Sequence, residues 1–203
     1  MAAVIVLLWG KHPTFGHLFH AMIQEKCPFI GVFYPKREKD ESETSHLISS
    51  GYVFGPDGQT LESEESYLNR MRALIRIYAA IVASNMGQDH PHGIDRGWIW
   101  LARTCSVEPI PSVSAAVIHA FLSACFFRLQ RVYGIQAVKL LHFISSTYIP
   151  MIEKATGPDV KKQSIVQLTM FVEETMKKLK RNLSLKPEGF LPDYFWEKSF
   201  LNS

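Results

Sequence analysis

Residues 63–85 read SEESYLNRMRALIRIYAAIVASN and carry apolar side chains three or four positions apart along most of their length. This spacing places one apolar face on a helix, and such a face is buried against other elements. Glu64 and Glu65 precede it, where the positive end of a helix dipole favours carboxylates. We therefore expect an amphipathic helix here, with a stripe formed by Leu68, Met71, Ile75, Tyr78 and Val82.

The same spacing recurs in three later segments. Residues 111–133 end before Gly134, which is suited to a helix C-cap, and a third helix begins near Ile135. This third helix meets Pro150, where proline either kinks a helix or opens a new one. Residues 160–181 form the last helix and end in a basic turn that complements the helix dipole. The predicted inward faces are Ile118, Phe121, Cys125, Leu129 and Val132 in the second helix, and Ile165, Leu168, Val172, Met176 and Leu179 in the last.

The alternating pattern of β-strands is almost absent from the chain. Four or more amphipathic helices joined by short turns are typical of a helical bundle or a helical repeat, although no exact repeat of fixed length occurs. A chain of 203 residues with 47% hydrophobic content can bury one sizeable core and needs no second domain. We therefore expect a single all-α domain over residues 1–203, with helix pairs resembling degenerate HEAT units.

Two segments carry loop signals instead. Residues 35–61 combine the run KREKDESE with several glycines and a proline, which predicts a mobile charged loop without helices. The tail from Leu183 onward mixes prolines and a glycine with many aromatic residues. Exposing these rings to water is unfavourable, so we expect the tail to dock on the body or on a partner. Its aromatic residues are Phe190, Tyr194, Phe195, Trp196 and Phe200.

Charge and cysteine usage exclude several classes of protein. The net charge of +3 and the pI near 8.7 fall short of the basic stripe of a nucleic-acid binder, so direct RNA binding is not indicated. Cys27, Cys105 and Cys125 form no CxxC pair, and we expect reduced thiols in the cytosol or nucleus. The apolar opening over residues 1–9 lacks a basic flank and is too short to cross a bilayer, so no membrane span is expected.

Residues 90–105 begin with the sequence HPHG and contain two tryptophans. Pro91 and Gly93 predict a turn. The residues that follow recur at helical spacing, so we expect the indoles of Trp98 and Trp100 to anchor a helix in the core. Gly97 suggests that another backbone passes close to this helix.

Catalytic chemistry has little support in the sequence. His90 and His92, with Asp95 nearby, form an H-x-H pair that a small metal-dependent hydrolase could use, and we keep that activity as an alternative. Because further ligands are missing, we favour a structural turn over a metal site. The sequence has no G-x-S-x-G elbow, Walker loop or GxGxxG motif after a strand, so we predict a protein that is not an enzyme.

Four blocks of the chain resemble, in order and spacing, the C-terminal domain of the GLE1 (GLE-one) family of mRNA export factors. The resemblance runs from end to end and implies an all-α, HEAT-like fold similar to the middle domain of the eIF4G-type translation scaffold. The family domain extends upstream of the position matching Met1, so the resemblance implies that the family's first helices are missing here. The blocks are residues 4–35, 67–81, 90–102 and 187–196, beginning VIVLLW, YLNRM, HPHG and PEGFL.

The resemblance implies a non-enzymatic adaptor at the cytoplasmic face of the nuclear pore. Such a protein binds the two lobes of a DEAD-box RNA helicase, favours the separated arrangement that releases RNA, and speeds ATP turnover. The family's second partner is an FG nucleoporin, for which Phe190, Phe195 and Trp196 are candidate contacts unless they complete the core. A helical scaffold in translation initiation or termination, bound to the corresponding factors, is the alternative function.

The family's small-molecule ligand is inositol hexakisphosphate. Fungal relatives place cations at the positions matching 22, 25 and 26 and use them to hold this ligand against the helicase. Met22, Glu25 and Lys26 occupy these positions here, on one face of a helix expected over residues 13–26. Several cations must converge on six phosphates, so we expect weak binding or none. The candidate residues are Lys26, with Lys11, Lys36 and Arg37 as possible supplements.

A second basic cluster lies near the C-terminus, from Lys177 to Arg181. It could contact RNA or an acidic protein, together with Lys161, Lys162 and Lys186. A solvated helix end is the interpretation we favour. No aromatic residues alternate with these cations, which argues against a stacking platform for single strands.

Overall fold

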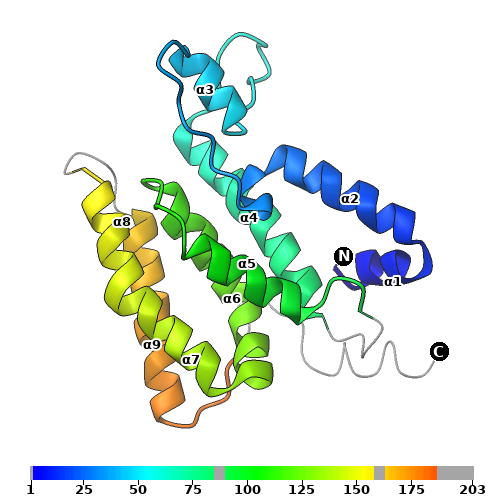
Figure 1. The fold of residues 1–203 in the computed structure, drawn as a ribbon, viewed down its shortest axis with the longest axis vertical. Coiled ribbons are helices and arrows are strands. Elements are labelled where there is room, and N and C mark those ends of the chain that lie inside the picture. Colours follow the sequence, from blue (N-terminus) through cyan, green and yellow to red (C-terminus); the bar gives the residue numbers. More distant parts are fainter. Residues whose placement is uncertain (1, 85–89, 158–162, 187–203) are drawn as a thin grey trace.

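The computed structural model describes residues 2–84, 90–157 and 163–186, and the regular elements in these ranges are helices (Figure 1). Strand pairing in the described residues is limited to one isolated bridge between Phe54 and Leu61. The all-α prediction is therefore confirmed. The elements are α1 (Ala2–Lys11), α2 (Pro13–Lys26), the 3-10 turn η1 (Pro28–Gly31), α3 (Glu43–Ser49), α4 (Glu64–Ala83), α5 (Ile94–Thr104), α6 (Val113–Tyr133), α7 (Ile135–Phe143), the π-helical turn η3 (Ile144–Tyr148), α8 (Ile149–Ala155) and α9 (Gln163–Lys180).

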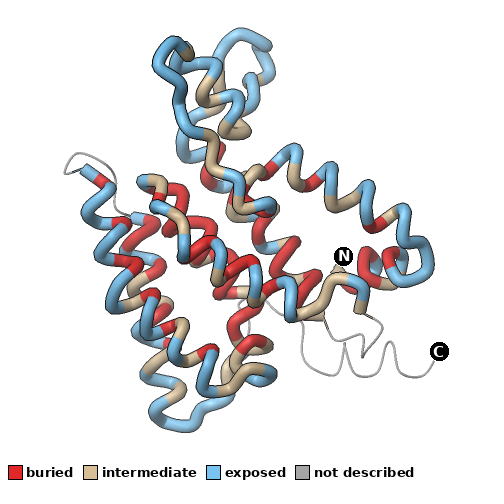
Figure 2. Tube along the Cα trace, in the orientation of Figure 1, coloured by how far each residue is buried: buried red, intermediate tan, exposed pale blue. Residues whose placement is uncertain are grey.

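The core is built on α4 and α6, which pack along each other more extensively than any other pair of elements. The hydroxyl of Ser63 caps α4 by accepting a hydrogen bond from the Ser66 amide. All five residues of the predicted α4 stripe are buried. Helix α6 also contacts α5, α7, α8 and α9, and its Ile118 and Phe121 are fully buried. Figure 2 shows the buried positions concentrated where these helices meet.

The central position of α6 explains its composition. Val113–Tyr133 is long and apolar enough to cross a membrane, yet 72% of its most apolar window is buried inside the fold. An apolar helix of this kind is what a core position requires. The length and hydropathy of α6 therefore reflect packing against its neighbours.

Two of the predicted inward faces end earlier than expected. Val132 is 49% exposed, so its prediction as an inward residue is wrong. None of residues 131–134 is buried, because the last turn of α6 projects beyond the packed part of the helix. In α9, Ile165, Leu168 and Val172 are buried as predicted, whereas Met176 and Leu179 are only partly buried.

The charged segment 35–61 contains a helix that the sequence did not predict. Helix α3 begins at Glu43 and is capped by Ser42, whose hydroxyl accepts a hydrogen bond from the Ser45 amide at 3.1 Å. None of its residues is buried. It was missed because an exposed helix of seven residues has no apolar stripe to reveal it. After α3, Tyr52 stacks on Tyr67 of α4 with ring centroids 3.8 Å apart, which ties the segment to the core.

Helix α5 is anchored by one of the two tryptophans. Trp100 is 2% exposed, and its indole N–H donates to the Phe29 carbonyl at 2.9 Å. Trp98 is only partly buried and packs against Tyr133 at the edge of the core. A Cβ on Gly97 would lie 3.0 Å from Val82 and 3.3 Å from Phe121. The close approach is therefore real, but the neighbours are side chains and not the predicted backbone.

Pro150 opens a new helix, one of the two alternatives that the sequence allowed. It lies in the first turn of α8, and the π-helical turn η3 joins this helix to α7. A π-helical turn absorbs an irregularity without ending the helical path. The last residue of η3 is Tyr148, whose hydroxyl proton is shared between the carbonyls of Thr104 at 2.9 Å and Val107 at 3.2 Å. The irregular turn thus connects the α7–α8 arm to the end of α5.

The three cysteines are free and buried, as expected for reduced thiols. Burial raises the pKa of Cys27 and of Cys105 to about 12. The pKa of Cys125 is raised further in the same direction by complete burial. Thiols that stay protonated at neutral pH are poor nucleophiles and poor metal ligands, so these side chains act as small apolar residues.

Candidate partner-binding surface

Helix α2 contributes less to the core than α4 or α6, since Gly16 and Ile23 are its only buried residues. Figure 1 shows it projecting to one side of the α4–α6 core. Phe15 and Phe19 turn toward α1, where they pack on the small cluster of Ile5, Val6, Trp9 and Ile81. Leu18 and Met22 lie one turn apart on the outer face and are 67% and 54% exposed. The fold leaves these two apolar side chains uncovered.

The orientation of α2 is fixed by its contact with α1. Pro13 occupies the first turn of α2, a position suited to its fixed φ angle. A Cβ on Gly16 would lie 2.0 Å from the indole of Trp9. Only glycine allows this approach, so the ring of Trp9 lies directly against the backbone of α2. The two helices thereby form one unit.

A cluster of aromatic and imidazole rings joins this unit to the core. The ring centroid of His92 lies 5.0 Å from that of His20 and 5.1 Å from that of Trp9. Its Nε2 atom lies 3.3 Å from the Tyr78 hydroxyl on α4. Burial lowers the pKa of His92 to about 4, and His20, Arg96 and His90 add to this effect. His92 is therefore neutral at pH 7 and packs as an aromatic ring.

The HPHG segment forms the predicted turn, and its hydrogen bonds account for His90. The Nε2 atom lies 2.8 Å from the Ile81 carbonyl, which requires a proton on that nitrogen. The Nδ1 atom accepts from the His92 amide at 3.1 Å. Both ring nitrogens are thus engaged, and His90 holds no lone pair for a metal. In the described residues, no group of three or more His, Cys, Asp or Glu side chains could hold a metal ion.

The predicted phosphate-binding cations do not converge. Lys26 ends α2 and lies 3.2 Å from the carboxylate of its neighbour Glu25, with both side chains exposed. Lys11 ends α1 at the opposite end of α2, about 20 Å away by the rise of a 14-residue helix. Lys36 lines a shallow depression with Glu38, Asp40 and Glu41. Each candidate is therefore either distant from the others or accompanied by carboxylates.

Arg37, the fourth candidate, donates its Nε–H to the Glu41 carbonyl at 3.2 Å. The predicted partner contacts Phe190, Phe195 and Trp196 lie outside the described residues, as do Lys161 and Lys162. Within the basic cluster of α9, Lys178 forms an ion pair with Glu174 at 2.7 Å, one turn away. This pair fits the solvated helix end that we favoured.

Two features of this surface were not predicted from the sequence. Arg70 of α4 pairs with Glu62 and donates to the carbonyls of Gly51 and Lys26, which ties α4 to the end of α2. No local pattern signals such long-range bonds. The exposed pair Leu18 and Met22 could have been found, because the apolar residues of α2 spread over more of its circumference than one buried stripe requires.

The described residues form an all-helical domain, in which a packed core supports a partly apolar outer helix. A family model described as "GLE1-like protein" matches residues 1–145, and the chain belongs to this family of mRNA export factors.

The relatives span animals and fungi. The chain is 33% identical over 201 residues to the mRNA export factor GLE1 of Mus musculus and 31% identical over 193 residues to that of Drosophila melanogaster. These matches cover 97% and 93% of the chain but 28% of each relative, so the chain spans little more than a quarter of their length.

The fold is also similar to a chain in the solved structure described as "S. cerevisiae Dbp5 L327V C-terminal domain bound to Gle1 and IP6". The TM-score is 0.74 at 22% identity, and the match covers 94% of this chain and 63% of the other. A related complex containing Gle1 H337R gives a TM-score of 0.73. The likeness confirms the fold that the family resemblance implied.

Proposed function

We propose that this chain acts in mRNA export by binding a DEAD-box RNA helicase and stimulating its ATPase at the cytoplasmic side of the nuclear pore. Support comes from its membership of the GLE1-like family and from its similarity to a chain solved with the helicase Dbp5. The chain would work as a rigid platform that favours one arrangement of the helicase lobes. Its effect is then a difference in affinity between helicase conformations, with the chemistry left to the helicase.

The main structural support for this proposal is the exposed apolar surface on the outer face of α2. Leu18 and Met22 are exposed apolar side chains one turn apart, on a helix whose orientation is fixed by Trp9 and the His92 cluster. An exposed apolar pair on a rigid support is a typical centre for a protein interface. The family resemblance implies a ligand-mediated helicase contact at the positions matching 22, 25 and 26, and Met22 is shared between those positions and this exposed pair.

We expect inositol hexakisphosphate to contribute little to this contact. The relative solved with this ligand, abbreviated IP6 in its description, is a fungal one. In this chain Met22 is apolar, and the Lys26 ammonium pairs with Glu25. A ligand of six phosphates would meet a net charge near zero on this face. We therefore expect the helicase to contact the apolar side chains of α2 directly, without a phosphate ligand between the two proteins.

The test is ATPase stimulation by this chain of a DEAD-box helicase with RNA. The double variant Leu18→Ser, Met22→Asp should reduce stimulation about tenfold, the scale of a hot-spot loss. The matched control is Val166→Ser, Met170→Asp on α9, because these residues are also one turn apart and are 52% and 65% exposed. Equal stimulation by both double variants would refute the α2 interface, and no stimulation by the unaltered chain would refute the proposed activity.

A second experiment addresses the phosphate ligand by titration calorimetry. The unaltered chain should bind inositol hexakisphosphate weakly or not at all at physiological salt. The variant Met22→Lys, Glu25→Lys places three cations on one face and should increase the affinity at least tenfold. Micromolar binding by the unaltered chain would contradict the first expectation, and no gain in the variant would show that this face does not contact the ligand.

The FG nucleoporin contact at Phe190, Phe195 and Trp196 is part of the same proposal. It rests on the family resemblance and on the aromatic content of the tail. Replacing Phe195 and Trp196 with serine should abolish co-purification of a cognate nucleoporin while leaving helicase stimulation intact. Retained nucleoporin binding would show that the nucleoporin contacts other residues of the domain.

A further inference from the structure

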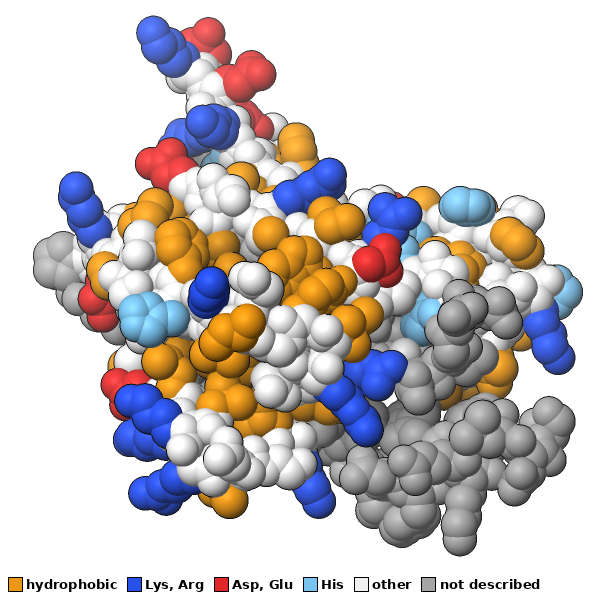
Figure 3. Space-filling model, turned by 60° about the horizontal axis from the view of Figure 1, so that its bottom comes forward, with side chains coloured by type: hydrophobic (Ala, Val, Ile, Leu, Met, Phe, Trp, Pro, Cys, Tyr) orange, Lys and Arg blue, Asp and Glu red, His pale blue; other side chains and the backbone are white. Residues whose placement is uncertain are grey.

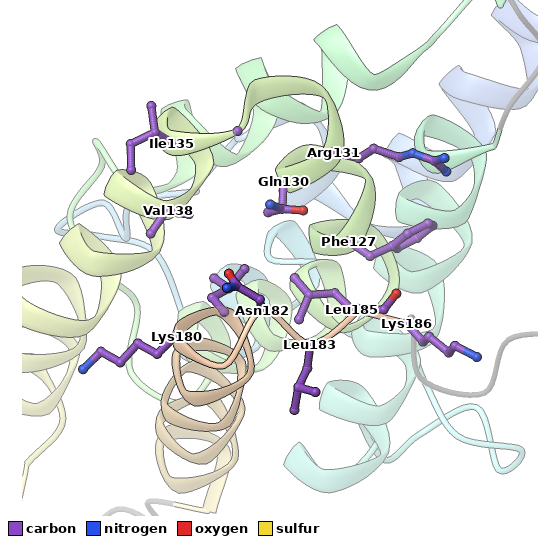
Figure 4. A pocket seen from close by; sticks show the side chains of 13 residues that line it. Phe127, Gln130, Arg131, Ile135, Val138, Lys180, Asn182, Leu183, Leu185 and Lys186 are labelled. Carbon is purple, nitrogen blue, oxygen red and sulfur yellow. The ribbon is translucent and has the colours of Figure 1, made fainter.

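A groove of about 920 Å³ lies on the side of the molecule away from α2, between the end of α6, the start of α7 and the segment that follows α9. Figure 4 shows the side chains that surround it. Its lining combines three cations with a set of apolar residues. Among the described residues that line it, none is Asp or Glu.

Two backbone turns shape the groove. Gly134, at φ +52°, joins α6 to α7 and lets the two helices diverge. Asn182, also at φ 52°, lies two residues after the end of α9, and the Leu183 amide donates back to the Lys178 carbonyl at 2.9 Å. This turn carries the chain across the open side between α6 and α9. The walls are therefore set by backbone geometry and exist without a ligand.

The charge of the groove is uniformly positive. Arg131, Lys180 and Lys186 line it, and none of the three has a carboxylate within ion-pair distance in the described part of the chain. In Figure 4, Arg131 and Lys186 lie at one end and Lys180 at the other. Figure 3 shows Lys and Arg side chains gathered along this lower face, with apolar surface between them.

The apolar residues of the groove fall into two groups. Leu179, Leu185 and Phe127 also pack against the core and form its floor. Ile135 and Leu183 also line the groove and are 64% and 52% exposed. In Figure 4, Leu183 lies between Lys180 and the pair Arg131 and Lys186, whereas Ile135 lies toward the end that carries Lys180.

We propose that this groove binds an acidic peptide segment of a partner protein, with apolar side chains between its carboxylates. The apolar walls would take the side chains, and the cations at both ends would take the carboxylates. Single-stranded nucleic acid fits less well, because the lining contains one aromatic ring and it is half-buried in the floor. The site lies away from α2 and is independent of the helicase contact proposed above.

Fluorescence anisotropy with a labelled synthetic peptide of sequence Glu-Phe-Leu-Asp-Glu-Phe-Leu-Asp tests this inference on the full chain. We expect saturable binding that Lys180→Glu and Ile135→Ser each weaken about tenfold. The matched controls are Lys139→Glu, an exposed cation on α7 outside the groove, and Val132→Ser, an exposed apolar residue outside it. Circular dichroism of each variant checks that the fold is retained.

Several results would overturn the inference. Equal weakening by Lys139→Glu would show that only the overall charge attracts the peptide. Unchanged binding of a peptide with serine in place of Phe and Leu would show that the apolar walls take no part. Tighter saturable binding of an RNA oligonucleotide, lost on Lys180→Glu, would assign the groove to nucleic acid. Helicase stimulation should be normal in Ile135→Ser, so failure of this inference is separable from failure of the proposed function.

Discussion

Helices α4 and α2 both carry apolar residues at helical spacing, but they use them differently. The five stripe residues of α4 are all buried, and Met71, Ile75 and Val82 have no exposed surface. On α2, Phe15, Phe19 and Ile23 face inward, while Leu18 and Met22 remain in solvent. A helix with more apolar residues than the fold can cover has surface left for a partner.

This difference predicts which residues are needed for stability and which for partner binding. Residues on the shared face of α4 and α6 hold the domain together, so changes there should unfold it. Among the described residues, the side chains of Leu18 and Met22 on the outer face of α2 belong to neither core cluster, so changes there should alter binding alone. Four measurements probe this division, beginning with the largest effect on stability.

Phe121→Ala should cause the greatest loss of stability among these variants. Phe121 is fully buried, with its ring centroid 4.4 Å from that of Trp100, and removing the ring leaves a cavity. We expect the free energy of unfolding, measured with denaturant at neutral pH, to fall by about 3–5 kcal/mol. Leu18→Ala on the outer face of α2 should change it by less than about 0.5 kcal/mol. Similar losses in both variants would remove the distinction between the two helices.

Gly16→Ala should have an intermediate effect, because the new methyl group would overlap the Trp9 indole. Displacing that ring should cost about 1–3 kcal/mol, typical of overpacking. Gly10→Ala is the matched control, since a Cβ at Gly10 meets nothing within 4 Å. Denaturant titration followed by tryptophan fluorescence measures both. A neutral Gly16→Ala would show that α2 is not held rigidly against α1.

Acidification should loosen the attachment of α2 before it affects the α4–α6 contact. The pKa of His92 falls from 6.5 to about 4 on folding, so the unfolded chain binds more protons between these values. The stability contributed by neutral His92 is therefore complete above pH 6.5 and is lost as the pH falls toward 4. The pKa values of His20 and His90 are lowered in the same direction, mainly by burial.

Denaturant midpoints at about pH 7 and about pH 5 measure this dependence. His92→Gln should reduce the difference between the two midpoints, whereas His142→Gln, at an exposed position on α7, should not. An unchanged pH dependence in His92→Gln would show that His92 does not couple protonation to folding.

Lys26→Ala should have the smallest effect on stability. Its ion pair with Glu25 is exposed, and such pairs are screened by water and salt. We expect an unfolding midpoint within experimental error of the unaltered chain. A clear loss of stability would mean that the end of α2 is part of the packed core.

The sequence was sufficient to predict the long helices that pack in the core. The stripes of α4, α6 and α9 were predicted because burial imposes a helical period on apolar residues. Helix α3 was not predicted, because it is short and exposed and depends on the cap at Ser42. The prediction for Val132 failed because periodicity shows which face is apolar and not where the neighbouring helices end.

The candidate surface was only partly predictable. Met22, Glu25 and Lys26 share the exposed face of α2 as their spacing indicated. Pairing of Lys26 with Glu25 could also be anticipated from adjacency, but the long-range role of Arg70 could not. The cations of the groove come from α6, α9 and the segment after it, and such convergence depends on the tertiary fold.

The position of α6 among α4, α5, α7, α8 and α9 has a kinetic consequence. The backbone amides of its buried turns can reach solvent only when most of its neighbours separate, so they should exchange with deuterium through global unfolding. The amides of α2 need only a local opening and should exchange sooner. A partner bound to α2 would then slow exchange in that helix and leave the rate in α6 almost unchanged.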